Sequence, residues 1–172
     1  YQLGGVLGTG GMGSVYEASH TRVERQFAIK VLNVKLAKDQ EAMARFAREA
    51  MLGSRLGHDH IVSVIDFDYT VEGFPFLVME RLTGNDLSRV LKKMGAFSLV
   101  RSASVMRQVG VALDAAHAEG VVHRDLKPEN IFLCQRQGGG EQIKVMDFGI
   151  SKVLTSDSIM TSHATILGTP WY

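Results

Sequence analysis

The sequence predicts an α+β fold in two parts, a strand-rich first part with one helix and the beginning of a mainly helical second part. Short runs rich in Val, Ile, Phe and Tyr, separated by glycine-rich or charged turns, dominate the chain before residue 80. One amphipathic helical pattern interrupts these runs, and after residue 85 the apolar residues recur at helical spacing over longer stretches.

The strand-like runs cover residues 3–7, 14–19, 26–33, 61–69 and 74–80. Between the third and the fourth run, residues 41–56 have helical spacing, and Asp39 is a suitable N-cap. One face of this helix would carry residues spaced three or four apart, namely Ala42, Phe46, Glu49, Gly53 and Leu56. A carboxylate, Glu49, thus lies in the middle of the inward face and requires an explanation.

After the fifth run the pattern becomes helical. Residues 85–94 predict a short helix, and residues 98–119 predict a longer one that ends at Gly120. The apolar side of the longer helix would hold Ala103, Met106, Val109, Leu113 and Ala116.

Composition excludes several classes of protein. The 172 residues suffice for one domain or slightly more, and 45% hydrophobic residues with 22% charged ones are ordinary for a globular chain. A balance of 19 basic and 18 acidic side chains gives no general attraction for nucleic acid or an anionic membrane. Cys134 is the sole cysteine, which excludes an intrachain disulfide and fits a reducing compartment. No apolar run approaches the roughly 18 residues that span a bilayer. We expect a cytoplasmic location for this segment, and a membrane anchor outside it stays open.

A glycine-rich loop occupies residues 7–15. Gly8, Gly10 and Gly13 give the pattern G-x-G-x-x-G, in which backbone N–H groups can approach phosphate oxygens closely. The pattern alone is weak, because a plain glycine-rich turn fits about as well. Residues 15–18 continue with β-branched and aromatic residues rather than starting a helix, so the loop predicts a hairpin that covers a nucleotide.

Three further motifs follow this loop in the chain. Residues 27–30 read F-A-I-K, residues 123–130 read H-R-D-L-K-P-E-N, and residues 147–149 read D-F-G. The four motifs together, in this order, resemble the protein kinase family. Segments such as GTGGMGSVYEA and HRDLKPENIFL are most similar to those of bacterial, eukaryotic-like serine/threonine kinases. The resemblance covers the whole chain.

The resemblance implies a two-lobed kinase fold. Residues 1–80 would form an N-lobe with an antiparallel five-stranded sheet and one helix, and residues 81–84 would form the hinge. Residues 85–172 would form the first part of the C-lobe, with the catalytic loop and the activation segment. The A-P-E segment and the helices that follow it in the family are not in this sequence, so we expect a catalytic domain truncated after the activation segment.

Specificity for serine and threonine follows from two features of the resemblance. Lys127, two residues after Asp125, is typical of Ser/Thr kinases, and the sequence around Thr169 resembles their substrate loop. Asp125 would orient or accept the proton of the substrate hydroxyl, and Lys127 would neutralise the transferred phosphate. Thr169 would support both side chains through hydrogen bonds.

The resemblance also assigns the ligands of the phosphates. Lys30 would hold the α- and β-phosphates as a point charge, and Glu49 would be its counter-ion, which explains the carboxylate on the inward helix face. Asn130 and Asp147 provide hard oxygen ligands suited to Mg²⁺ that bridges the phosphates.

The adenine of ATP would lie between apolar walls. Val15 and Ala28 would form the roof, Phe132 the floor, and Met79 would close the back of the pocket. The other expected ATP contacts are the glycine loop with Leu7, Gly8, Gly10 and Gly13, the backbone groups of Glu80 and Leu82 for the base, and Asp86 for the ribose.

The segment 152–166 contains several hydroxyl side chains. It fits either a polar surface loop or an activation segment ordered by phosphorylation, in which Arg124 would pair with the phosphate. Thr161 and Thr165 are the expected phosphorylation sites by resemblance, through self-phosphorylation or within a kinase dimer. His123 is expected to act through packing and hydrogen bonds.

Two functions from different classes remain open at this point. The first is an ATP- and Mg²⁺-dependent kinase that phosphorylates protein Ser and Thr in bacterial signal transduction. The second is a catalytically inactive remnant that binds a nucleotide or a partner. Every residue of the motifs is present, which favours an active kinase over an inactive remnant. The GTPWY sequence argues against kinases of small molecules.

Overall fold

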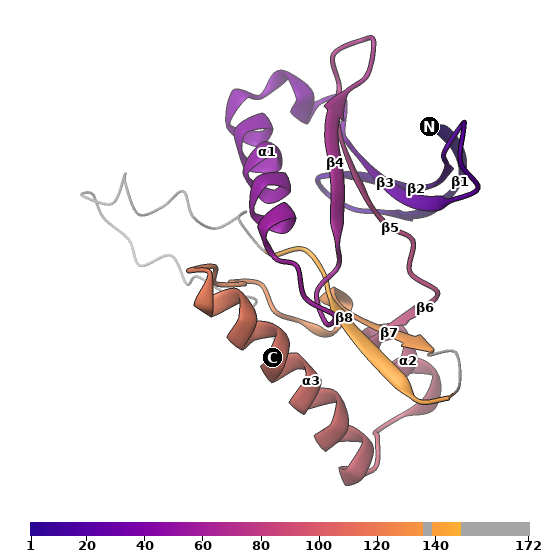
Figure 1. Ribbon diagram of the computed structural model, residues 1–172, viewed down its shortest axis with the longest axis vertical. Helices are drawn as coiled ribbons and strands as arrows, with labels where there is room; N and C mark the ends of the chain where they lie inside the picture. The colour runs from indigo at the N-terminus through magenta and orange to yellow at the C-terminus, as the bar shows by residue number, and fades with distance from the viewer. Residues whose placement is uncertain (136–138, 149–172) are drawn as a thin grey trace. The chain divides into compact units, whose positions relative to one another are not determined.

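The computed structural model describes residues 1–135 and 139–148 (Figure 1). The chain forms two compact units. The first unit comprises Tyr1–His58 and Val62–Thr83, and the second comprises Asp59–Ile61 and the chain from Gly84 onward.

A five-stranded antiparallel sheet builds the first unit, as the sequence predicts. Its strands, in spatial order, are β1 (Gln2–Thr9), β2 (Gly13–Ser19), β3 (Gln26–Leu32), β5 (Pro75–Glu80) and β4 (Val64–Tyr69). The expected fourth strand begins three residues later than residue 61. Ile61 instead forms an isolated bridge with Val145, and both residues belong to the second unit.

Helix α1 (Gln40–Arg55) follows a short 3₁₀ helix (Leu36–Lys38) and packs against this sheet (Figure 1). The carboxylate of Asp39 accepts hydrogen bonds from the backbone N–H groups of Glu41 and Ala42, which confirms the predicted N-cap.

The sheet of the first unit buries side chains on both faces. One face holds the apolar cluster of Ala18, Phe27, Ile29 and Val78. The other face joins the sheet to α1 through Leu32, Phe46, Ala50 and Leu77. Because successive side chains of a strand point to opposite faces, Ala28 and Lys30 share the α1 face with Leu32.

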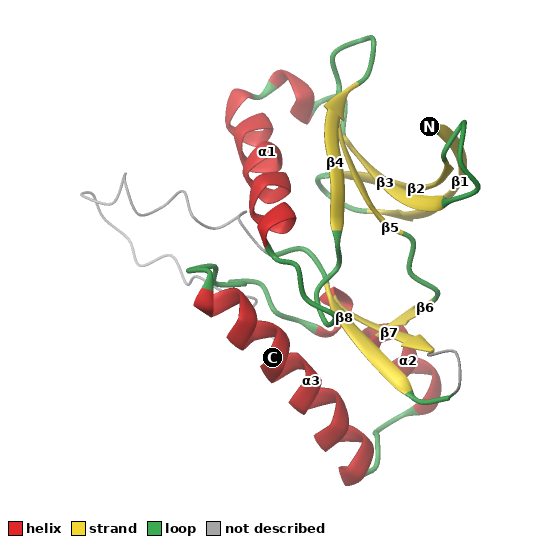
Figure 2. Cartoon of the chain, in the orientation of Figure 1, coloured by secondary structure: helices red, strands yellow, loops and turns green. Residues whose placement is uncertain are grey.

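The second unit contains helices α2 (Leu87–Met94) and α3 (Leu99–Ala118) and a second sheet (Figure 2). That sheet is antiparallel, with the order β6 (Gly84–Asp86), β7 (Ile131–Gln135) and β8 (Glu141–Val145). The expected helix at 85–94 begins at Leu87, because the residues before it form β6. At Gly84, where φ is +146°, a Cβ would lie 2.0 Å from the Leu133 carbonyl oxygen, so the strand pairing requires glycine.

Helix α3 has the predicted ends, with Ser98 as N-cap and Gly120 in the left-handed region at φ +72°. Its predicted apolar side is partly wrong, since Ala103 is exposed and Met106 is 60% exposed. The buried side consists of Val105, Gln108, Val109, Ala112 and Ala116. Gln108 interrupts the apolar pattern on that side, and this interruption misdirected the assignment. Within residues 1–135 and 139–148, no helix has the length and apolar character to cross a bilayer.

Candidate active site

The glycine loop is the tip of the β1–β2 hairpin, as predicted. Gly8 lies opposite Val15, and the backbones of Gly10 and Gly13 bond to each other across the tip, with N···O distances of 2.8 and 3.3 Å. A Cβ at Gly13 would lie 2.0 Å from the Val31 carbonyl oxygen, whereas a Cβ at Gly8 would meet nothing within 4 Å. Gly13 therefore allows close packing on β3, while the outer part of the loop keeps its backbone accessible.

Strand register places the predicted nucleotide-lining residues of the first unit on one face of the sheet. Val15 on β2 is opposite Lys30 on β3, and Ala28 on β3 is opposite Met79 on β5. Residues that are directly opposite, or two apart on one strand, project to the same side. The predicted roof residues, Lys30 and Met79 thus share the face that α1 covers in part.

An ion pair joins this face to α1. The Nζ atom of Lys30 lies 2.7 Å from Oε1 of Glu49, and the two side chains are only 11% and 14% exposed. A nearly buried carboxylate and ammonium stabilise each other against desolvation. The carboxylate that the sequence placed on the inward helix face has the partner expected for it.

The segment after β5 has its own backbone and side-chain contacts. The N–H of Glu80 donates to the Ser63 carbonyl at 3.0 Å, and the Glu80 carboxylate accepts the Ser63 N–H at 2.7 Å. The guanidinium of Arg81 donates to the Leu82 carbonyl and lies 3.3 Å from the Glu17 carboxylate. These bonds fix the backbone at the two residues expected to contact the base.

The catalytic loop lies in the second unit and contains an unusual backbone conformation. Among the described residues, Arg124 and Asp147 are the only non-glycine residues with a positive φ, at +62° and +49°. Such conformations cost energy and gather at functional sites. One of these residues precedes Asp125, and the other is the predicted metal ligand.

Asp125 is held by its own loop. Its Oδ2 accepts a bond from Nζ of Lys127 at 2.7 Å, and its carbonyl oxygen accepts one from the side-chain amide of Asn130 at 2.9 Å. Its N–H donates to the carbonyl of His123 at 2.8 Å. The structure therefore brings together the predicted base, its predicted cationic neighbour and one predicted metal ligand.

His123 connects this loop to the chain before Asp147. Its Nε2–H donates to the Met146 carbonyl at 2.9 Å, its Nδ1 accepts the Asp125 N–H at 3.3 Å, and its ring packs on Phe148 with centroids 4.8 Å apart. Burial lowers the pKa of His123, because desolvation disfavours the charged ring more than the bond to Met146 and the nearby Asp147 and Asp125 favour it. His123 thus has the packing and hydrogen-bonding role that we expected.

Asn130 and Asp147 suit a hard divalent cation. The Asn130 side-chain nitrogen is engaged with Asp125, so its amide oxygen is the atom left to face a cation, and the Asn130 carbonyl accepts the Met146 N–H at 2.8 Å. This bond places the backbone of Asn130 beside the residue that precedes Asp147. Among the described residues, no group of three or more His, Cys, Asp or Glu side chains could hold a metal.

Asp86 and Phe132 are neighbours in the second unit, directly opposite each other in the β6–β7 pairing. The Asp86 carboxylate caps α2 through the Arg89 N–H at 2.8 Å and lies 3.1 Å from the Arg89 side chain. If Asp86 contacted a ribose, its carboxylate would have to bind the ribose and the Arg89 N–H at the same time. Thr161, Thr165 and Thr169 lie outside the described residues.

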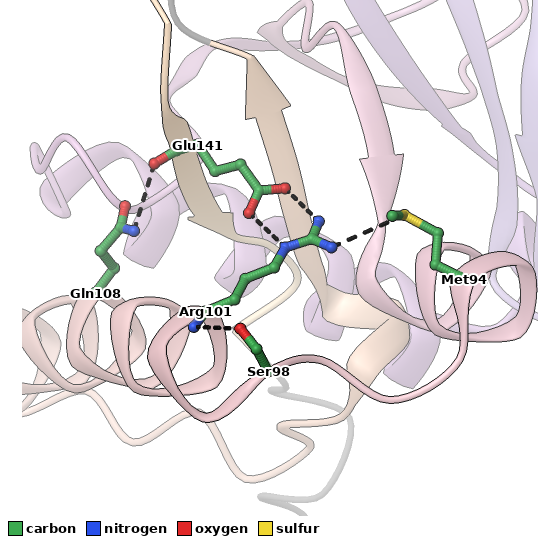
Figure 3. Close-up of polar contacts among 5 residues, drawn as sticks. All are labelled: Met94, Ser98, Arg101, Gln108 and Glu141. Atoms are coloured by element: carbon green, nitrogen blue, oxygen red, sulfur yellow. Dashed lines mark hydrogen bonds and ion pairs between the residues drawn. The ribbon is translucent and has the colours of Figure 1, made fainter.

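Sequence reasoning missed a polar cluster between α3 and β8 (Figure 3). Arg101 binds the Glu141 carboxylate with two nitrogens, at 2.9 and 2.5 Å, and Gln108 bonds to the backbone of β8. The pair lowers the pKa of Glu141 below its usual value and raises that of Arg101. The polar Gln108 in a run of apolar helix positions was the signal that could have revealed it.

Comparison with known proteins agrees with this fold. The family described as "Protein kinase domain" matches residues 1–172. A solved structure, a double mutant of the Mycobacterium tuberculosis PknI kinase domain, is similar with a TM-score of 0.74 and 32% identity; the match covers 87% of this chain and 58% of that one. The chain belongs to the protein kinase family.

The curated proteins that the chain resembles include bacterial serine/threonine-protein kinases. The chain is 45% identical over 167 residues to serine/threonine-protein kinase Pkn1 of Myxococcus xanthus, with 96% of this chain and 24% of the relative covered. It is 40% identical over 176 residues to probable serine/threonine-protein kinase PknB of Corynebacterium glutamicum, with 100% of this chain and 27% of the relative covered. The chain thus spans about a quarter of the length of these relatives.

Proposed function

We propose that this chain carries the catalytic residues of an ATP- and Mg²⁺-dependent protein kinase that phosphorylates Ser and Thr hydroxyls. The observation that supports this most strongly is the loop around Asp125, where Lys127, Asn130 and His123 all bond to the predicted base or its backbone. The names of the bacterial relatives support specificity for Ser and Thr.

In this proposal Asp125 receives the proton of the substrate hydroxyl as that oxygen attacks the γ-phosphorus of ATP. The bond from the γ-phosphorus to the bridging oxygen breaks, and ADP leaves. Lys127, already paired with Asp125, offers positive charge beside the site of transfer, where negative charge develops. Lys30 holds the α- and β-phosphates, and Glu49 keeps the ammonium group in place. Asn130 and Asp147 would hold Mg²⁺, which neutralises phosphate charge when bound.

The partners of the protein follow from this chemistry. ATP and Ser- or Thr-containing proteins are its substrates, and nucleic acid is not a partner. Thr161 and Thr165 are proposed sites of self-phosphorylation, alone or in a kinase dimer, with Arg124 as the cation that binds the phosphate. We further propose a role in cytoplasmic signalling, with any membrane anchor outside this segment.

The test uses the full-length protein with radiolabelled ATP, Mg²⁺ and a Ser- and Thr-containing protein substrate. Replacement of the base in Asp125→Asn should lower the rate of phosphate transfer by about 10²–10⁴-fold. Asp114→Asn, on the exposed side of α3, is the matched control and should leave the rate unchanged. Equal rates for Asp125→Asn and the wild type would exclude Asp125 as the base. A wild-type protein that binds ATP but transfers no phosphate would favour the inactive remnant.

A further inference from the structure

The outer edge of β8 is completed by groups that are not strands. In an antiparallel pair, alternate residues direct their backbone N–H and C=O groups away from the partner strand. β8 pairs with β7 on one side, so the backbone groups on its other side need different partners.

Gln108 of α3 provides the first of these partners. Its Oε1 accepts the Ile143 N–H at 3.1 Å. Its Nε2 donates to the Glu141 carbonyl at 3.4 Å (Figure 3). Gln108 is only 8% exposed, and its Nε2 also donates to the Ser104 carbonyl of its own helix at 3.3 Å. One side chain thus imitates the pair of hydrogen bonds that a neighbouring strand would make.

Residues 59–61 continue the same edge. The ring Nδ1–H of His60 donates to the Ile143 carbonyl at 3.0 Å, and the Val145 N–H donates to the His60 carbonyl at 2.8 Å. The side chain of Lys144 donates to the Ile61 carbonyl at 3.2 Å. Gln108 and His60 together therefore bond the strand along its outer side from Glu141 to Val145.

An ion pair fastens α3 to the start of the strand. Arg101 lies seven residues before Gln108, about two helical turns away on the same face of α3. Its guanidinium holds Glu141 with two bonds and lies 3.7 Å from the centre of the Phe97 ring. Figure 3 shows Arg101 and Gln108 projecting from the helix toward the same residue, Glu141. Bidentate pairs of this kind fix orientation as well as distance.

The strand leads directly to the predicted metal ligand. Met146 follows β8, and its N–H and carbonyl are bonded to Asn130 and His123. Asp147 comes next with φ at +49°, a conformation that persists only when the surrounding structure holds it. Gln108 fixes the strand four residues before Asp147, upstream of the bonds made by Met146.

We propose that Gln108 is a positioning residue for Asp147: by closing the outer edge of β8, it holds the strand in the place that lets the Asp147 carboxylate share a cation with Asn130. The proposal rests on the proposed function, since it concerns the Mg²⁺ that Asp147 and Asn130 would bind. It extends that function to a side chain that touches neither ATP nor the protein substrate.

The experiment compares two variants of the full-length protein. Gln108→Met keeps the size of the side chain and removes both hydrogen bonds to β8. Val109→Ala is the matched control, because it removes buried volume from the adjacent position of the same helix without removing a hydrogen bond. Both variants should lower the melting temperature, which alone would not separate positioning from a general loss of stability.

Two measurements distinguish a positioning role of Gln108 from a general loss of stability. In hydrogen–deuterium exchange without nucleotide, Gln108→Met should raise the exchange rate in residues 141–147 at least tenfold, whereas Val109→Ala should not do so selectively. In the kinase assay, Gln108→Met should raise the Mg²⁺ concentration for half-maximal rate about three- to tenfold, with the KM for the protein substrate unchanged.

An equal shift of the Mg²⁺ requirement in both variants, or none in Gln108→Met, would overturn the inference. If the wild type transfers no phosphate, the proposed function fails separately. The role of Gln108 is then judged on exchange alone, and unchanged rates in residues 141–147 would overturn it.

Discussion

Two ion pairs of equal length hold the predicted catalytic lysines in very different ways. Lys30 meets Glu49 at 2.7 Å across 19 residues of chain, and Lys127 meets Asp125 at 2.7 Å across two. The first pair needs α1 to be packed on the sheet, and its side chains are nearly buried. The second forms inside one loop and is more exposed, at 30% and 18%. The position of the first pair therefore depends on the core of the first unit, and the position of the second depends on local backbone bonds.

The largest expected effect on stability comes from replacing each lysine in turn, which tests this difference. Lys30→Met leaves the nearly buried Glu49 carboxylate without this cation and should lower the free energy of unfolding by about 3 kcal/mol. Lys127→Met should lower it by about 1 kcal/mol or less, because the Asp125 carboxylate is half-buried in a loop that water can reach. Urea unfolding of both variants measures the two losses. Equal losses would show that the packing of α1 does not distinguish the pairs.

A smaller effect is expected where α1 touches the sheet. A Cβ on Gly53 would lie 2.5 Å from Cγ2 of Val64, and Val64 is itself packed against the α1 core, so Gly53→Ala must push the helix or the strand apart. We expect a loss of about 1–3 kcal/mol. Gly110→Ala in α3 is the control, since nothing lies within 4 Å of its Cβ, and it should stabilise the protein by up to about 1 kcal/mol.

Urea unfolding of a double variant checks whether the contact with Val64 causes the loss of stability in Gly53→Ala. In the double variant Gly53→Ala, Val64→Ala, the loss should be smaller than the sum of the two single losses, because the second change removes the clashing methyl group. Strictly additive losses would mean that the contact with Val64 does not limit the approach of α1.

The two units also differ in how much of their structure could be predicted from the sequence. The hairpin at the glycine loop and the cap at Asp39 follow from local patterns. The carboxylate on the inward helix face is also visible in the sequence, but its partner Lys30, 19 residues away, was assigned from the resemblance to protein kinases. The strand β6 was not predicted, because three residues carry too little pattern and pair only through β7. Gln108 was missed because its partners are backbone groups of a strand 33 and 35 residues away.

The same limit applies to the site. Motifs identified Asp125, Lys127 and Asn130, which are neighbours in sequence and in space. They did not reveal that Asp86 caps α2, because residues 85–94 were all predicted as helix although the first two belong to β6. They also did not reveal that Ile61 bridges to Val145 of β8, because that bridge depends on tertiary pairing. Sequence patterns are most informative where the interacting groups are close along the chain or lie on one amphipathic face.

The smallest expected effect concerns pH and the loop of the second unit. Burial holds the pKa of His123 below its ordinary value of 6.5, so the folded protein keeps the ring neutral while the unfolded chain takes up a proton. The contribution of His123 to stability is therefore complete above pH 6.5 and decreases as the pH falls toward the lowered pKa. His123→Gln retains a hydrogen-bond donor for Met146 but does not titrate, so its unfolding free energy should depend less on pH between about 7.5 and 5.

The difference in slope should amount to about 1 kcal/mol over that interval, since one pH unit corresponds to at most about 1.4 kcal/mol for a single proton. His117→Gln, on the exposed side of α3, provides the control and should keep the wild-type slope. If both variants retain the wild-type dependence, the pH response does not arise from His123. If only His123→Gln loses it, the pH response arises in the locally bonded loop, where a single ring joins the predicted base to the strand that ends at Asp147.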